Sequence, residues 1–185
     1  YSPGVPLGTQ SQWGWHSFAN PENYRFEETL GLYDFGRGRK EPYAVQLKDA
    51  RGRGASDWYR VNPHRLHLGI IGFDGIHYDD VKHVDQTLDM WVGKLNSRFE
   101  VDGQNVYVQT ACNPDADIVA AEIDSPARIP VVIRFPYPTG LHSGDACDWT
   151  KDELHETSFV QLSEGVALVK RVLDETIYYV KLSYE

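Results

Sequence analysis

The chain has 185 residues, of which 41% are hydrophobic and 24% charged, and its formal net charge is −9. This length and composition are typical of a single globular domain with a sizeable core. The negative charge argues against a nucleic-acid partner, and no apolar run approaches the ~20 residues that would span a bilayer. We therefore expect neither a nucleic acid nor a membrane as a partner.

The first predicted feature is an aromatic loop at residues 8–24, where several rings lie between glycines and a proline. Trp13, Trp15 and His16 are its central members. Loops seldom contain tryptophan without a reason. Flat rings beside amide and imidazole groups suit a sugar, whose C–H face stacks on a ring while its hydroxyls need hydrogen-bond partners. The alternative interpretation is that these rings close one end of a β-sandwich.

The rest of the first third of the chain is rich in turns. Glycine and proline recur every few residues up to Gly54, so long regular elements are not expected there. We expect at most a short helix over residues 56–60, with Ser56 as its cap and Asn62-Pro63 as its end.

From Leu66 onward the sequence is typical of short strands. Asp102-Gly103 is a strong hairpin signal between residues 97–101 and 105–109, because glycine tolerates the positive φ that such turns need. The other predicted strands cover residues 66–73, 76–78, 87–95, 117–123, 129–135, 157–162, 166–173 and 177–184. Many short strands separated by turn residues predict an all-β fold, either an antiparallel sandwich or a barrel.

Residue types of common catalytic and metal centres are present, but not with the spacing that those centres need. His64 and His67 enter an extended run, where an odd spacing sends side chains to opposite faces and disfavours a two-histidine chelate. Asp145 and Asp148 lack a calcium-loop pattern, and no carboxylate pair is singled out for glycoside hydrolysis. We therefore predict no catalytic residue, no metal and no cofactor.

The chain contains two cysteines, Cys112 and Cys147. Two cysteines are too few for a disulfide scaffold, and their spacing does not fit a zinc knuckle. Two free thiols and a single disulfide are both compatible with the sequence.

Several segments, taken in order, resemble a known family. The segments are residues 9–18 (TQSQWGWHSF), 37–43 (RGRKEPY), 62–69 (NPHRLHLG), 88–95 (LDMWVGKL), 106–110 (VYVQT), 113–117 (NPDAD) and 133–138 (IRFPYP). Together they resemble the amino-terminal region of bacterial six-hairpin glycosidases. The pattern Leu-Asp-Met-x-x-Gly before a hairpin is also similar to the amino-terminal domains of disaccharide phosphorylases.

The resemblance implies a two-sheet antiparallel β-supersandwich of galactose-mutarotase-like topology, followed in such enzymes by an (α/α)6 barrel that holds the catalytic carboxylates. Residues 1–185 would then be a single β-sandwich domain of a longer glycosidase-like chain, with a loop-rich segment at 1–63 and sandwich strands at 64–185. Its expected partners are a carbohydrate and the carboxy-terminal barrel. Trp13, Trp15 and His16 would help to shape the sugar site, with no catalytic residue in this chain.

Four functions follow as hypotheses, of which the last is a structural or adhesion domain without a ligand. The first is a non-catalytic sandwich domain of a glycoside hydrolase, which would leave an apolar patch where the barrel docks. The second is a stand-alone carbohydrate-binding module. The third is a mutarotase-like epimerase, which would need a histidine and a carboxylate facing each other in one groove, with His64 or His67 as the first candidate. By analogy with exported glycan-degrading enzymes, we expect a periplasmic or extracellular location.

Overall fold

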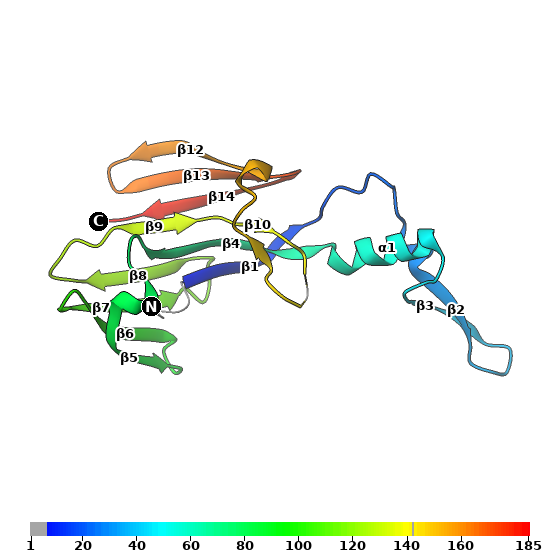
Figure 1. The fold of residues 1–185 in the computed structure, drawn as a ribbon, viewed down its shortest axis with the longest axis horizontal. Helices are drawn as coiled ribbons and strands as arrows, with labels where there is room; N and C mark the ends of the chain where they lie inside the picture. The colour runs from blue at the N-terminus through cyan, green and yellow to red at the C-terminus, as the bar shows by residue number, and fades with distance from the viewer. Residues whose placement is uncertain (1–6, 142) are drawn as a thin grey trace. The chain divides into compact units, whose positions relative to one another are not determined.

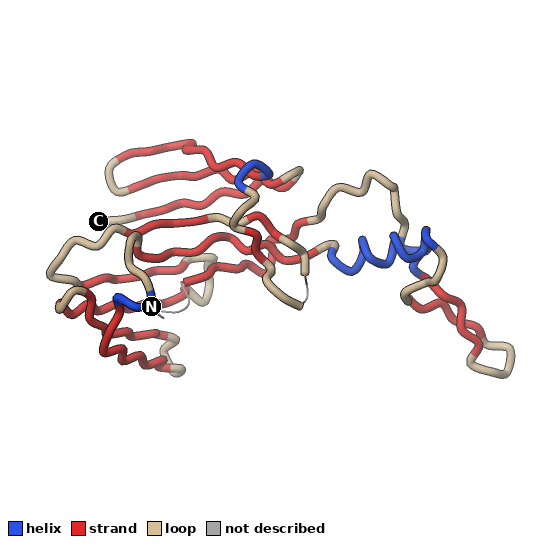
Figure 2. Tube along the Cα trace, viewed as in Figure 1, coloured by secondary structure: helices blue, strands red, loops and turns tan. Residues whose placement is uncertain are grey.

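The computed structural model describes residues 7–141 and 143–185. Strands dominate the described chain, which has a single α-helix and several antiparallel sheets (Figure 2). The predicted all-β class is therefore confirmed. The chain divides into two compact units. One contains the residues up to Ser11 together with His67–Phe135, and the other contains Gln12–Leu66 and Pro136–Glu185.

The first unit is built from two sheets. One is a meander whose strands pair in chain order (green in Figure 1): β5 (Val81–Asp89), β6 (Lys94–Val101), β7 (Gln104–Cys112) and β8 (Val119–Asp124). The other sheet has the order β1-β4-β9, with β1 at Leu7–His16, β4 at His64–Phe73 and β9 at Val131–Arg134. β1 and β4 each continue along the chain into the second unit.

The core of the first unit joins these sheets. Phe73 on β4 lies 6.1 Å, between ring centroids, from Phe99 on β6. Val106 and Val108 on β7 complete the buried cluster. They stand two residues apart and so share one face of the strand. The opposite face of this four-stranded sheet is left to polar side chains.

The hairpin predicted at Asp102-Gly103 is confirmed, since β6 and β7 pair across it with Val101 opposite Gln104. Two neighbouring predictions are wrong. Residues 76–78 do not form a strand but lead into a 3-10 turn, η2 (Tyr78–Asp80). Residues 87–95 do not continue through Met90 and Trp91, because the Asp89 carboxylate accepts a hydrogen bond from the Trp91 amide and turns the chain there.

The second unit combines a three-stranded sheet, two short hairpins and the helix (Figure 1). The sheet has the order β12 (His155–Ser163), β13 (Val166–Leu173) and β14 (Thr176–Ser183). The hairpins pair β2 (Leu30–Asp34) with β3 (Lys40–Ala44) and β10 (Tyr137–Pro138) with β11 (Cys147–Asp148). The helix is α1 (Ala50–Val61), and the 3-10 turns are η1 (Phe26–Thr29) and η3 (Asp152–Leu154).

Helix α1 corrects the expectation that the first third lacks long regular elements. It begins at Ala50, six residues before the predicted start at Ser56. Asp49 is its cap, because the Asp49 carboxylate accepts a hydrogen bond from the Gly52 amide at 2.8 Å. Ser56 is not the cap, since its hydroxyl donates to the Val45 carbonyl. The predicted end before Asn62 is confirmed.

The glycines inside α1 do not break the helix. They are positions where neighbouring side chains pack closely against its backbone. A Cβ at Gly54 would lie 2.4 Å from the Tyr24 hydroxyl, so only glycine lets that ring pack on the helix. Sequence periodicity alone does not reveal this packing.

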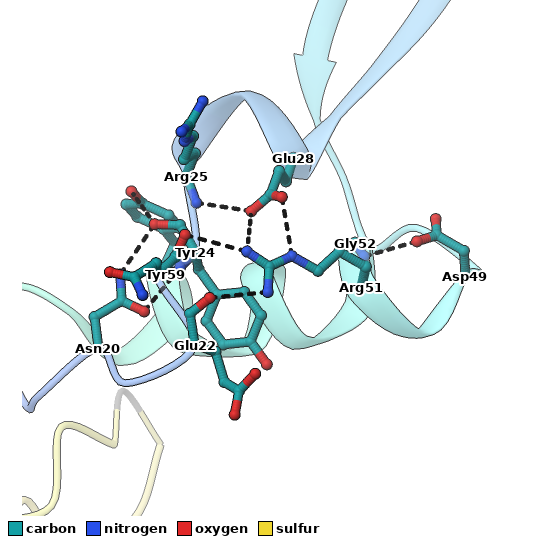
Figure 3. Close-up of polar contacts among 10 residues, drawn as sticks. Asn20, Glu22, Tyr24, Arg25, Glu28, Asp49, Arg51, Gly52 and Tyr59 are labelled. Carbon is teal, nitrogen blue, oxygen red and sulfur yellow. Dashed lines mark hydrogen bonds and ion pairs between the residues drawn. The ribbon is translucent and has the colours of Figure 1, made fainter.

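Hydrogen bonds from Arg51 connect the start of α1 to η1 and to the loop before it (Figure 3). Its guanidinium donates to both carboxylate oxygens of Glu28, at 2.9 and 3.0 Å, and to the backbone carbonyls of Glu22 and Asn23. The guanidinium carbon also lies 4.6 Å from the centre of the Tyr24 ring. These contacts lower the pKa of the Glu28 carboxyl, chiefly through the hydrogen bond from Arg51.

Cys112 and Cys147 are both free thiols, so the single disulfide that the sequence allowed does not form in this structure.

Candidate functional site

The predicted aromatic loop is wrong over residues 8–16, which belong to strand β1 (Leu7–His16). The three side chains predicted to contact sugar therefore lie on this strand, and the structure describes two of them. The side chain of Trp13 lies outside the described residues. His16 is buried, whereas Trp15 is 49% exposed and its indole lies 5.4 Å from the Arg65 guanidinium carbon. Successive residues of a strand point to opposite faces. Trp15 and His16 therefore do not lie on one surface of β1.

His16 is the centre of a buried polar cluster within the second unit. Its Nδ1 lies 3.0 Å from His64 Nε2, and its Nε2 lies 2.9 Å from the Asp174 carboxylate. Asp174 comes from the two-residue turn between β13 and β14 and has a φ of 49°, a conformation that aspartate tolerates better than most residues. The Tyr137 hydroxyl, on β10, donates to the same Asp174 oxygen at 2.7 Å.

The hydrogen-bonding pattern fixes how many protons His64, His16 and Asp174 hold together. The Val61 carbonyl only accepts, so His64 Nδ1 must donate to it across 2.7 Å. The three hydrogen bonds that link Val61, His64, His16 and Asp174 need three hydrogens, whereas two neutral imidazoles and an ionised carboxylate supply only two. The cluster therefore carries one additional proton.

His64 is the ring whose charged form is disfavoured. Burial, together with the nearby His16, lowers the pKa of His64. His16 Nε2 lies 2.9 Å from the Asp174 carboxylate.

Aromatic rings and a close backbone approach enclose the cluster. The Phe18 ring packs against the rings of His16 and His64, at centroid distances of 5.2 and 4.9 Å. The Phe18 amide donates to the buried Asn62 side chain, which in turn donates to the Trp58 carbonyl at the end of α1. A Cβ at Gly140 would lie 3.0 Å from His64 Nδ1, so a side chain there would push against the cluster.

A second buried group adjoins the first through Tyr137, whose ring stacks on His155 at a centroid distance of 6.2 Å. Arg171 on β13 is fully buried and donates to the Thr157 hydroxyl and to His155 Nδ1. Burial and the Arg171 charge both lower the pKa of His155. Burial and the hydrogen bond to Asp174 raise the pKa of Tyr137.

This arrangement suits a structural role better than a chemical one. Both nitrogens of His16 and both nitrogens of His64 are already bonded to protein groups. A general acid or base needs a nitrogen that can reach a substrate. The cluster therefore joins β1, β4, β10 and the β13–β14 turn. Sequence reasoning selected His16 but missed Asp174, Tyr137 and Arg171.

The outer face of the β5–β8 sheet carries a different kind of candidate site, a shallow groove of about 340 Å³. Two rows of side chains cross the four strands there, because each member pairs with its neighbour in the sheet register. The first row is Asp85, Arg98, Tyr107 and Asp124. The second row is Thr87, Asn96, Gln109 and Glu122.

Sequence reasoning did not identify this groove, although the signal was present. On each of the four strands the two lining residues stand two positions apart, as side chains on one face of a strand must. The polar residues of β6 and β7 alternate with Ser97, Phe99, Val106 and Val108, which are buried. Which strands pair decides whether such residues meet, and the pairing becomes visible only in the structure.

No helix among the described residues is long and apolar enough to cross a membrane. Searches of protein-family models, of curated proteins and of solved structures found no match to this chain.

Proposed function

We propose that this chain is a non-catalytic β domain of a larger carbohydrate-active protein, a glycoside hydrolase, in which it supports a catalytic domain and contributes to sugar binding. The order of sequence motifs supports the glycosidase assignment, and the mostly β structure is compatible with it. The supersandwich topology, the (α/α)6 partner and a periplasmic or extracellular location are parts of the same proposal. Trp15 stays a candidate sugar contact on the exposed face of β1.

The observation that carries the proposal is an uncovered apolar surface at the end of β5. Met90 and Trp91 in the β5–β6 turn are 87% and 96% exposed, and Leu88 and Val92 beside them are also exposed. Four apolar side chains so close together in the chain are seldom all exposed to solvent unless they form a contact surface for a partner. This turn, which we call the Trp91 turn (Leu88–Val92), is the proposed contact for the catalytic domain.

The polar cluster favours a non-catalytic role over an epimerase. A mutarotase-like mechanism needs a histidine and a carboxylate that face a sugar from one groove. His64 meets Val61 and His16 instead, and the carboxylate of Asp174 is bonded to His16 and Tyr137. We therefore expect no turnover from this chain.

The function is tested with one panel of neutral and acidic oligosaccharides, assayed for hydrolysis, for mutarotation and for binding by isothermal titration. We expect binding of at least one member and no turnover of any. Turnover by the purified chain would contradict the non-catalytic role. Failure of every glycan to bind would contradict the role in sugar binding and leave a purely supporting domain.

The Trp91 turn gives a separate prediction. In the double variant Met90→Ser/Trp91→Ser, the free energy of unfolding should stay within about 0.5 kcal/mol, because neither side chain is buried. The fluorescence of an added apolar dye such as ANS should fall, because its binding surface is removed. Tyr184→Ser, at an exposed position outside the turn, is the control. Equal dye binding by the double variant and the parent would rule out the turn as an apolar contact surface.

A stand-alone carbohydrate-binding module is the second candidate, and the groove on the β5–β8 sheet favours it. Such a module would need no docking partner. The stand-alone module predicts that the Met90→Ser/Trp91→Ser variant binds glycan with unchanged affinity. The primary proposal predicts the same result when this chain is tested by itself. The two differ in the longer protein, where only the primary proposal makes catalysis depend on the turn.

A further inference from the structure

We propose that the groove on the outer face of the β5–β8 sheet binds a neutral saccharide chain, with Asn96, Tyr107 and Glu122 among its contact residues. This inference rests on the proposed function and gives it a site that is separate from the aromatic segment of β1. It follows from the chemistry of the lining, the order already present in its amides and its charge.

The amides of the second row are held in place before any ligand arrives. Gln109 Nε2 donates to Asn96 Oδ1 at 2.8 Å, and Lys94 Nζ donates to Gln109 Oε1 at 3.0 Å. These bonds fix which end of each amide is the donor and leave the Asn96 NH2 group for a ligand. Fixed donors bind hydroxyls with less loss of side-chain entropy than mobile ones do.

Carboxylates stand at both edges of the groove. Asp85 lies on β5 at one edge, and Glu122 and Asp124 lie on β8 at the other. Within residues 7–141 and 143–185, none of these three side-chain carboxylates makes a hydrogen bond or an ion pair. Three strand spacings separate the edges, about 14 Å. A ligand that spans this width with hydroxyls at both ends would meet acceptors on each side.

The first row supplies a flat surface between these edges. The Arg98 guanidinium carbon lies 5.5 Å from the centre of the Tyr107 ring. The Tyr107 ring is exposed and lines the groove. A ring and a guanidinium held together offer both an apolar plane and N–H donors. A sugar ring needs this combination, because its C–H face is apolar and its rim is polar.

The charge of the groove selects among saccharides. Three carboxylates face one guanidinium and the neighbouring Lys94 ammonium, so the groove is negative overall. An acidic sugar, such as a uronate, would bring like charges together, which costs binding energy. A neutral saccharide meets acceptors and donors without that penalty, so the groove is specific for neutral chains.

The test compares binding of cellohexaose, xylohexaose, maltohexaose and laminarihexaose with binding of hexagalacturonate to the whole chain, by isothermal titration. We expect at least one neutral hexaose to bind and hexagalacturonate not to bind. Asn96→Ala, Tyr107→Ala and Glu122→Gln should each raise the Kd about tenfold, the effect of losing one good contact. All three residues are exposed, so circular dichroism should show an unchanged fold.

Matched controls lie outside the groove on exposed strand positions. Asn105→Ala on β7 and Tyr179→Ala on β14 remove the same side-chain types and should leave the Kd unchanged. If a neutral hexaose binds and only Trp15→Ala weakens it, the groove is wrong and the proposed function stands. If no neutral hexaose binds, the groove proposal is wrong, and the sugar-binding role is also wrong if hexagalacturonate does not bind either. Equal affinity for hexagalacturonate would overturn the selection by charge.

Discussion

His16→Ala is expected to lower the free energy of unfolding by about 3 kcal/mol. The substitution removes a fully buried ring and two hydrogen bonds, and it leaves His64 Nε2 in a buried site without its donor. The measurement is urea-induced unfolding at neutral pH, followed by tryptophan fluorescence and by circular dichroism. This change is among the largest that a single substitution at the cluster can produce.

Trp15→Ala is the matched control, since it alters the adjacent residue on the opposite face of β1. Its ring is half exposed and contacts the Arg65 guanidinium, so its loss should cost less than about 1 kcal/mol. Equal costs for the two variants would mean that the hydrogen-bonded chain from Val61 to Asp174 adds nothing to stability.

A marked loss of stability on acidification is the second large effect. Burial lowers the pKa of both His64 and His155 below the ordinary value of 6.5. Unfolded histidines take up protons near pH 6.5, whereas these two resist doing so when folded. The unfolded state therefore binds more protons as the pH falls below 6.5, and each histidine contributes a loss of up to about 1.4 kcal/mol per pH unit until its folded-state pKa is reached.

The urea midpoint measured between pH 7.5 and pH 4.5 tests this expectation. His155→Gln should make the slope below pH 6.5 shallower, because one of the two buried titrations is removed. His77→Gln, at an exposed histidine of the first unit, should leave the slope unchanged. A profile that is flat through pH 6.5 in the parent chain would show that neither buried histidine resists protonation.

Local turn chemistry explains which parts of the fold could be predicted from sequence. The hairpin at Asp102-Gly103 and the strands of the β12–β14 sheet fall where the turn residues and apolar runs predict them. Helix α1 was largely missed, because Gly52 and Gly54 indicate a break when Leu47 and Tyr24 are not seen packing against them. The Trp91 turn was missed because Met90 and Trp91 lie inside the run that predicted a strand over residues 87–95.

The candidate sites depended on contacts that no local pattern contains. His16 and Asp174 are 158 residues apart in sequence, and only the fold brings the turn after β13 to the end of β1. Arg171 lies within the apolar run of β13, where a charged residue is usually assigned to the solvent face. The groove could not be predicted without the register of four strands, although the two polar residues of each strand are visible in its sequence.

The alternation along β13 has a consequence for how the chain reaches its native pairing. Ala167, Val169, Arg171 and Leu173 are all buried on one face, and Asp174 follows in the turn. A slip of one residue against β12 or β14 would expose this entire face, bury Lys170 and carry Asp174 away from His16. An all-apolar strand would tolerate such a slip far better. The contacts of Arg171 and Asp174 thus favour the native register of the sheet, because a shifted pairing would lose them. Hydrophobic burial alone would distinguish the two registers less well.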